Sequence, residues 1–152
     1  MIRMKPHHFV DIITDFGEGS LSFEPHPYGH ANYTVSKEIL ANPDVMLEME
    51  LGADDICKPC RHNINGLCDN IIDISFRPTA PLSEREYNLL LDQRWCNRLN
   101  IKQGDRLTAK EFCALLNNLT GDIMDIYIET PAEMTREREK YLKKGIKKFV
   151  KL

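Results

Sequence analysis

The sequence has no apolar run near the length of a membrane span. A helix that crosses a bilayer needs roughly 20 mostly apolar residues, and no segment of this 152-residue chain approaches that length. The basic start Met1–His8 leads into Phe9–Asp15, where acidic residues interrupt the apolar region that a secretion signal requires. We therefore expect a protein that is neither membrane-bound nor secreted, located in the cytoplasm.

Cysteine is sparse, and its count is odd. The chain has five cysteines, whereas small disulfide-stapled secreted domains carry dense, usually even sets. A disulfide scaffold is therefore a poor explanation of these cysteines, and a reducing cytoplasm is a good one. Internal repeats and low-complexity segments are also lacking, so we expect one domain over residues 1–152.

What is present is the composition of an ordinary globular domain, with 42% apolar and 28% charged residues. The net charge of −3 hides an asymmetry, because Arg136–Leu152 carries eight Lys or Arg and two Glu. The remaining chain is acidic, which makes nucleic-acid binding improbable except through this basic end. We expect residues 130–152 to form a basic amphipathic helix packed on the domain, because apolar residues recur along one flank.

Hydrophobic periodicity predicts a mostly helical α+β domain with about two short strands. Residues 31–41 repeat at helical spacing and stop before Pro43. Val45–Leu51 and Ile71–Phe76 alternate with a period of two and are predicted strands. The stretch from Gly17 to His30 is rich in turn formers and predicts a long ordered loop.

Capping patterns predict the starts of three further helices. Ser83 precedes Glu86, Thr108 precedes Glu111, and Thr130 precedes Glu133, each by three residues. We expect Cys96 and Cys113, which lie inside such helices, to be buried and inert.

The segment from Asp54 to Asn70 holds the three remaining cysteines, Cys57, Cys60 and Cys68, among turn-forming residues. Metal binding deprotonates thiols, and soft sulfur ligands favour zinc, copper(I) or iron–sulfur clusters. A redox dithiol would need a helix amino terminus and positive surroundings, but acidic residues precede Cys57. The spacing therefore predicts a metal site.

A closed metal site needs a fourth ligand, for which the histidines are the main candidates. We favour the pair His7 and His8 over His62, and only one of the pair should face a given metal because neighbouring side chains diverge. His26 and His30 are expected to be ordinary polar residues. Asp54, Asp55 and Asp69 suit turn capping better than binding a thiolate-selected metal.

Several of these residues resemble a known family of small prokaryotic proteins, described as iron–sulfur-binding without an established reaction. The resemblance covers roughly residues 5 to 120, and is carried by Lys5-Pro6-His7-His8, Asp54-Asp55-Ile56-Cys57-x-x-Cys60 with Cys68, Asp92 through Arg98-Leu99, and Gly104-Asp105-Arg106-Leu107-Thr108. It implies a metal or cluster site at His7, His8, Cys57, Cys60 and Cys68.

The chain departs from that family at two places. Asp11 stands where the family has a cysteine after the histidine pair, and further cysteines near the carboxyl end are absent. Three hypotheses therefore remain open. The first is an iron–sulfur cluster completed by Asp11, a histidine or an external molecule. The second is a zinc-stapled Cys3His binding or scaffold module, and the third is a metal-dependent hydrolase or deaminase with Asp11, Asp54 or Asp55 as the general base. The substrate and any protein partner stay undefined.

Overall fold

A computed structural model describes residues 1–119 and 121–152, and within them the predicted α+β class is confirmed. The helices are α1 (Pro6–Glu18), α2 (Asn32–Ala41), α3 (Glu84–Leu99), α4 (Ala109–Asn117) and α5 (Ala132–Phe149). The strands are β1 (Ile2–Met4), β2 (Met46–Met49), β3 (Asn63–Ile64), β4 (Leu67–Cys68) and β5 (Arg106–Thr108). No helix among the described residues combines the length and apolar character needed to cross a bilayer.

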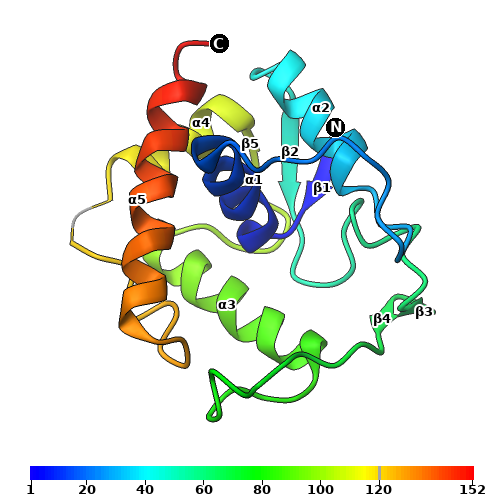
Figure 1. Cartoon of the computed structure of the whole chain (residues 1–152). Coiled ribbons are helices and arrows are strands. Elements are labelled where there is room, and N and C mark those ends of the chain that lie inside the picture. Colours follow the sequence, from blue (N-terminus) through cyan, green and yellow to red (C-terminus); the bar gives the residue numbers. More distant parts are fainter. Residues whose placement is uncertain (120) are drawn as a thin grey trace.

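Helix α1 is the centre of the molecule, with α5 along one side, α3 below it and the sheet on the other side (Figure 1). Its residues Phe9, Val10, Ile12 and Ile13 are almost fully buried. Pro6 suits the first helical turn because its missing N–H needs no partner there. The helix ends at Gly19, which has φ 80°, a conformation that glycine adopts without strain.

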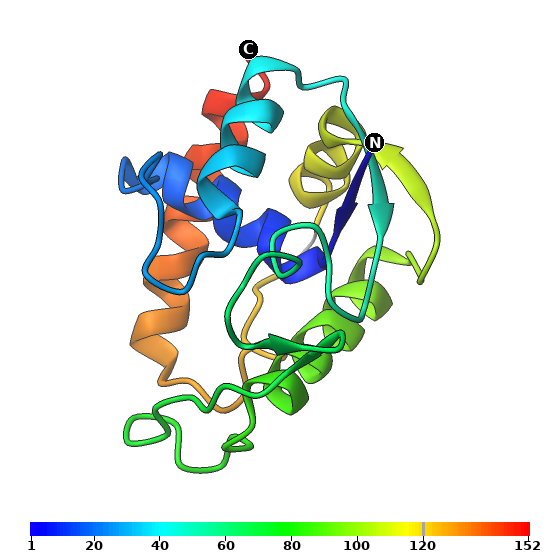
Figure 2. The same cartoon turned by 90° about the vertical axis from the view of Figure 1, so that its right-hand side faces the viewer.

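The main sheet has the order β1-β2-β5, with β1 parallel and β5 antiparallel to β2. Leu47 and Met49 of β2 are fully buried, while Met46 is exposed, which matches the predicted alternation. The sheet places the start of α1 beside the cysteine segment, which crosses in front of α1 in Figure 2. The second pair of strands, β3 and β4, forms a hairpin within that segment.

Helix α5 packs closely along α1 through two glycines. A Cβ atom on Gly145 would overlap the Ile13 carbonyl oxygen, and one on Gly17 would overlap the Tyr141 carbonyl oxygen. Thr135, Leu142, Ile146 and Phe149 of α5 are buried, and its lysines are exposed.

Two predicted caps formed, and one did not. Ser83 accepts the Glu86 N–H, and Thr108 with Glu111 makes a complete capping box. The cap at Thr130 is wrong, because α5 begins at Ala132 after Pro131 without a side-chain cap bond. The Thr130 N–H instead donates to the Tyr127 carbonyl, so Thr130 belongs to the preceding turn.

The predicted strand Ile71–Phe76 is also wrong. Only Ile71 makes an isolated bridge, to Ser83. The Asp73 carboxylate accepts the Ser75 N–H, and this local bond bends the chain out of an extended conformation. Helix α2 confirms the predicted helix at residues 31–41, and a loop follows α1 as expected.

Candidate metal site

Asp54 organises the cysteine segment. Its Oδ1 accepts hydrogen bonds from the N–H groups of Ile56 and Cys57, each at 3.0 Å. Its Oδ2 accepts the Lys5 N–H and contacts His8 Nδ1, each at 2.7 Å. Both oxygens thus accept hydrogen bonds and the side chain is fully buried, so Asp54 fastens the segment to the start of α1.

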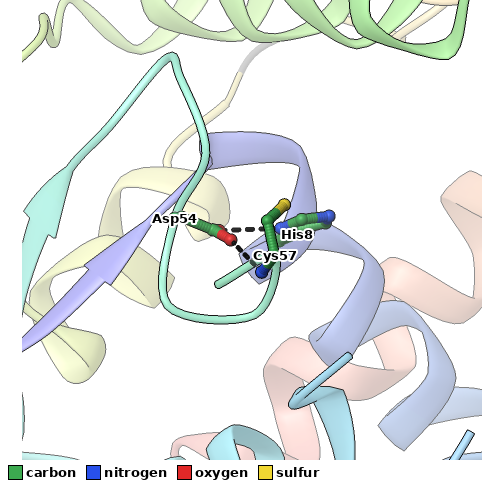
Figure 3. A group of neighbouring side chains, drawn as sticks. All are labelled: His8, Asp54 and Cys57. Atoms are coloured by element: carbon green, nitrogen blue, oxygen red, sulfur yellow. Dashed lines mark hydrogen bonds and ion pairs between the residues drawn. The ribbon is translucent and has the colours of Figure 1, made fainter. Parts of the chain in front are cut away.

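The same contact sets the orientation of His8 (Figure 3). Because Nδ1 of His8 donates to a carboxylate, Nε2 is the ring nitrogen left for a metal, as is common for metal-binding histidines. A ring nitrogen of His8, a carboxylate oxygen of Asp54 and Cys57 Sγ lie within 4.8 Å of one another. His8 therefore lies beside one of the predicted thiol ligands, although it is 49 residues away in sequence.

His7 is held in a different direction. Both its N–H and its Nδ1 lie 2.8 Å from Asp92 Oδ1 on α3. The two imidazole rings are close, with centroids 4.4 Å apart, but His7 is not part of the group formed by His8, Asp54 and Cys57. Within the described residues, only His8 of the predicted pair lies in a group with a cysteine.

The hairpin β3–β4 carries Cys68 back toward the other thiols. Its turn uses Asn65 and Gly66 with φ 53° and 85°, the left-handed conformation that these two residue types tolerate best. The Cys60 N–H donates to the Cys57 carbonyl at 2.9 Å, which closes a tight turn between these two cysteines. Cys57, Cys60 and Cys68 are all free and partly buried.

Cys68 has a neighbour on α3 that sequence reasoning missed. Its thiol donates to Glu84 Oε2 at 3.4 Å, and Asn70 Nδ2 donates to the same oxygen at 3.0 Å. The Glu84 N–H in turn donates to the Asn70 carbonyl at 3.1 Å. No local pattern marks Glu84, because its first-turn position predicts only a favourable helix charge.

The hydrogen-bond partner of Nδ1 decides whether each of the remaining histidines could bind a metal through Nε2. In His26 and His30 the Nδ1 atom accepts a backbone N–H, from Tyr28 and Asn32 respectively. Nε2 of both rings must then carry the hydrogen, which makes it a donor and not a metal ligand. This agrees with the ordinary polar role expected for them.

His62 has the opposite arrangement. Its Nδ1 lies 2.8 Å from Asp69 Oδ1, and its Nε2 is buried without a hydrogen-bond partner among the described residues. His62 is therefore a second nitrogen donor in the cysteine segment. Asp69 orients it in the way that Asp54 orients His8.

The electrostatics favour the protonated thiols of Cys57 and Cys68 in the metal-free protein. Burial and the nearby Asp54 carboxylate raise the pKa of Cys57 to about 12. Burial, with a contribution from Glu84, also raises the pKa of Cys68. Burial opposes the charge on His8, but Asp54 outweighs it and raises the His8 pKa. Burial likewise opposes the charge on Asp54, yet His8 and the hydrogen bonds lower its pKa.

The three acidic candidates for a general base are already engaged. Asp11 pairs with Arg138 at 2.6 Å. Asp55 accepts the Arg3 N–H at 2.9 Å, and Asp54 has four donors. This favours binding over hydrolysis at an open metal.

Cys96 and Cys113 lie away from this segment, inside α3 and α4. They are 8% and 0% exposed, as predicted. Burial raises the pKa of both thiols, to about 11 and about 12.

Comparisons of the chain with protein-family models, curated proteins and solved structures found no match. His8, Asp54 and Cys57 form a group that could hold a metal. Soft thiols beside an oriented imidazole are the donors that zinc and iron–sulfur clusters take.

Proposed function

We propose that this protein is a metal-binding protein whose centre lies on Cys57, Cys60 and Cys68, with an iron–sulfur cluster as the cofactor. The observation that carries the proposal is the buried Asp54, which folds the cysteine segment and orients His8 beside Cys57. This carboxylate accepts from Ile56 and Cys57 in the loop and from Lys5 and His8 at the start of α1. A fully satisfied buried group of this kind makes the loop rigid. The resemblance of the cysteine motif to iron–sulfur-binding proteins points to the same cofactor.

The state of the thiols supports a metal in preference to thiol catalysis. A nucleophilic cysteine needs a lowered pKa, whereas the pKa of Cys57 is raised to about 12. A metal ion would replace the protons of the thiols. Its positive charge would also offset the repulsion between the thiolates and the neighbouring carboxylates of Asp54 and Glu84.

The spacing of the donors favours a cluster over one ion. Ligand atoms around a tetrahedral zinc lie roughly 3.8 Å apart, given a Zn–S distance near 2.3 Å. Among the described residues, no group of three donor atoms within 4.8 Å contains two of the three cysteines. A cluster spans more widely spaced thiols, since its cysteines bind different irons.

A zinc-stapled Cys3His module is the second candidate, and the imidazole of His8 favours it. Its Nε2, which the Asp54 contact leaves available, would complete a tetrahedral set with the three thiolates. Such a site would tie α1 to the cysteine segment and would serve binding or scaffolding.

Anaerobic purification followed by absorption spectroscopy and metal analysis separates the two. A brown protein with iron and acid-labile sulfide supports the cluster, and a colourless protein with about one zinc per chain overturns it. Cys68→Ala should lose the metal, and Cys113→Ala, a buried cysteine far along the chain, should keep it. Full metal content in the Cys68 variant would contradict the assigned site.

A further inference from the structure

Helix α5 carries a row of basic residues along its outer face. This basic stripe consists of Arg136, Lys140, Lys143, Lys144 and Lys147, which are all exposed. Spacings of three and four residues place these side chains on one side of a helix. The buried residues Leu142, Ile146 and Phe149 lie on the opposite side. The basic stripe therefore points away from the domain, at the edge of the molecule that α5 forms in Figure 1.

Most charges of the basic stripe have no acidic partner. Within the described residues, α5 makes two ion pairs, Arg138 with Asp11 at 2.6 Å and Lys143 with Glu139 at 3.5 Å. Arg138 is not part of the stripe, so four of the five stripe residues are unpaired in the part of the chain that the structure describes. The segment 140–152 contains six lysines and no acidic residue, while the rest of the chain is acidic.

This arrangement destabilises the helix when nothing is bound to it. Like charges four residues apart on a helix repel each other, and Arg136–Lys140 and Lys140–Lys144 are such pairs. The helix dipole compensates cations only in the last turn, where Lys147 lies. A helix face that served only to be solvated would be more stable with acidic residues four positions from its lysines. A bound polyanion would remove the repulsion.

We propose that the basic stripe binds the phosphate backbone of a nucleic acid. From Arg136 to Lys147 the stripe is about 16 Å long, at 1.5 Å per residue. One strand of a duplex places about five phosphates along that length. The number of basic side chains therefore matches the number of phosphates in reach.

The composition of this face favours phosphates over a protein or a membrane. Every exposed residue from position 136 to position 147 is charged, and Glu137 is the acidic one among them. Stable protein interfaces depend on buried aromatic or apolar anchors, and helices that lie in a membrane surface insert an apolar face. The apolar face of α5 is already packed on the domain. Contacts to a phosphate backbone need charge alone and do not depend on base sequence.

The experiment titrates the full-length protein into a fluorescein-labelled DNA duplex of about 20 base pairs and follows fluorescence anisotropy from about 50 to about 200 mM KCl. Binding should be independent of base sequence and should weaken with salt. Each neutralised phosphate contributes about −0.9 to the slope of log K against log salt, so three to five contacts give a slope between about −2.7 and about −4.5. An RNA duplex of the same sequence is titrated in parallel, and the tighter duplex identifies the nucleic acid that supplies the phosphates.

The double variant Lys140→Gln, Lys144→Gln should reduce the size of the slope by about 1.8 and weaken binding at about 50 mM KCl by about tenfold or more. Glutamine has nearly the helix propensity of lysine, so α5 should be retained. The matched control is Lys37→Gln, Lys102→Gln, which changes the net charge equally at exposed positions outside α5 and should leave the slope unchanged.

Three results overturn the proposal. The first is that neither duplex binds at about 50 mM KCl. The second is an equal loss of affinity in the two double variants, which would mean that net charge and not the basic stripe determines binding. The third is binding to phosphatidylserine-containing vesicles without binding to either duplex, which would make the partner a membrane surface.

Discussion

Replacing Asp54 by Asn tests whether the buried carboxylate organises the metal-free site. Asn keeps one acceptor oxygen but puts an NH2 group in place of the other. Where the amide replaces Oδ2, the NH2 group opposes the Lys5 N–H, while His8 can accept from it by carrying its hydrogen on Nε2. In the flipped rotamer the NH2 group opposes the Ile56 and Cys57 N–H groups. At least one hydrogen bond to a charged acceptor is therefore lost, worth about 1.5–3 kcal/mol, and the other bonds lose the charge of their acceptor.

The expected loss in the free energy of unfolding is about 3–5 kcal/mol, the usual cost of leaving one member of a buried charged pair unpaired. For a chain of this size that lowers the unfolding midpoint by roughly 6–20 °C. The assay is denaturant and thermal unfolding at pH 7 with a chelator present, so that metal binding does not contribute.

Asp69→Asn supplies the control. Asp69 contacts His62 Nδ1 at 2.8 Å, almost the same length as the Asp54–His8 contact, but its side chain is 57% exposed while that of Asp54 is 0% exposed. Exposed pairs contribute at most about 1 kcal/mol. The prediction is refuted if Asp54→Asn and Asp69→Asn lose the same free energy of unfolding, or if Asp54→Asn loses less than about 1 kcal/mol. Either result would mean that the buried Asp54 carboxylate does not hold the cysteine segment in place.

Further predictions concern the packing and charge of α1. Gly145→Ala should lower the free energy of unfolding by about 1–3 kcal/mol, because its Cβ would overlap the Ile13 carbonyl; an unchanged urea midpoint would contradict the close packing of α5. Burial and Asp11 raise the Asp15 pKa to about 6. The folded state thus holds its proton more tightly than the unfolded state, and ionising Asp15 costs stability as pH rises from about 4 to about 6. Asp15→Asn should therefore raise the free energy of unfolding at pH 7.5 by about 1 kcal/mol, a value reduced because Asp15 is partly exposed. At pH 3.5 the substitution should leave the free energy of unfolding unchanged. Thermal unfolding at the two pH values checks this, and an equal gain at both would be contrary to it.

Local chemistry made part of the fold predictable. The side chains of Ser83 and Thr108 each accept a hydrogen bond from the backbone N–H three residues ahead. Because both partners are close in sequence, the starts of these two helices could be predicted. The alternation in β2 likewise reflects one buried face. Helix α1 was not predicted, although its buried residues Phe9, Val10, Ile12 and Ile13 follow the spacing of an amphipathic helix.

Two members of the group that the structure brings together, His8 and Cys57, were among the ligands that the sequence predicted. Metal-binding chemistry marks the spacing of Cys57, Cys60 and Cys68, and turn formers explain the hairpin between Cys60 and Cys68. The groups that orient the donors come from distant segments: Asp54 is 46 residues from His8, and Asp92 is 85 residues from His7. Such pairings depend on how β1, α1 and α3 pack, which no local pattern encodes.

The central claim is that thiols of the cysteine segment bind one metal centre. X-ray absorption at the metal edge of anaerobically purified protein tests it most directly, because the method measures the distances from the metal to its ligands. The account predicts a strong sulfur shell near 2.3 Å that is weakened, or lost together with the metal, in Cys57→Ser and unchanged in Cys96→Ser. A metal surrounded by nitrogen and oxygen alone, or the same sulfur shell in Cys57→Ser, would contradict it.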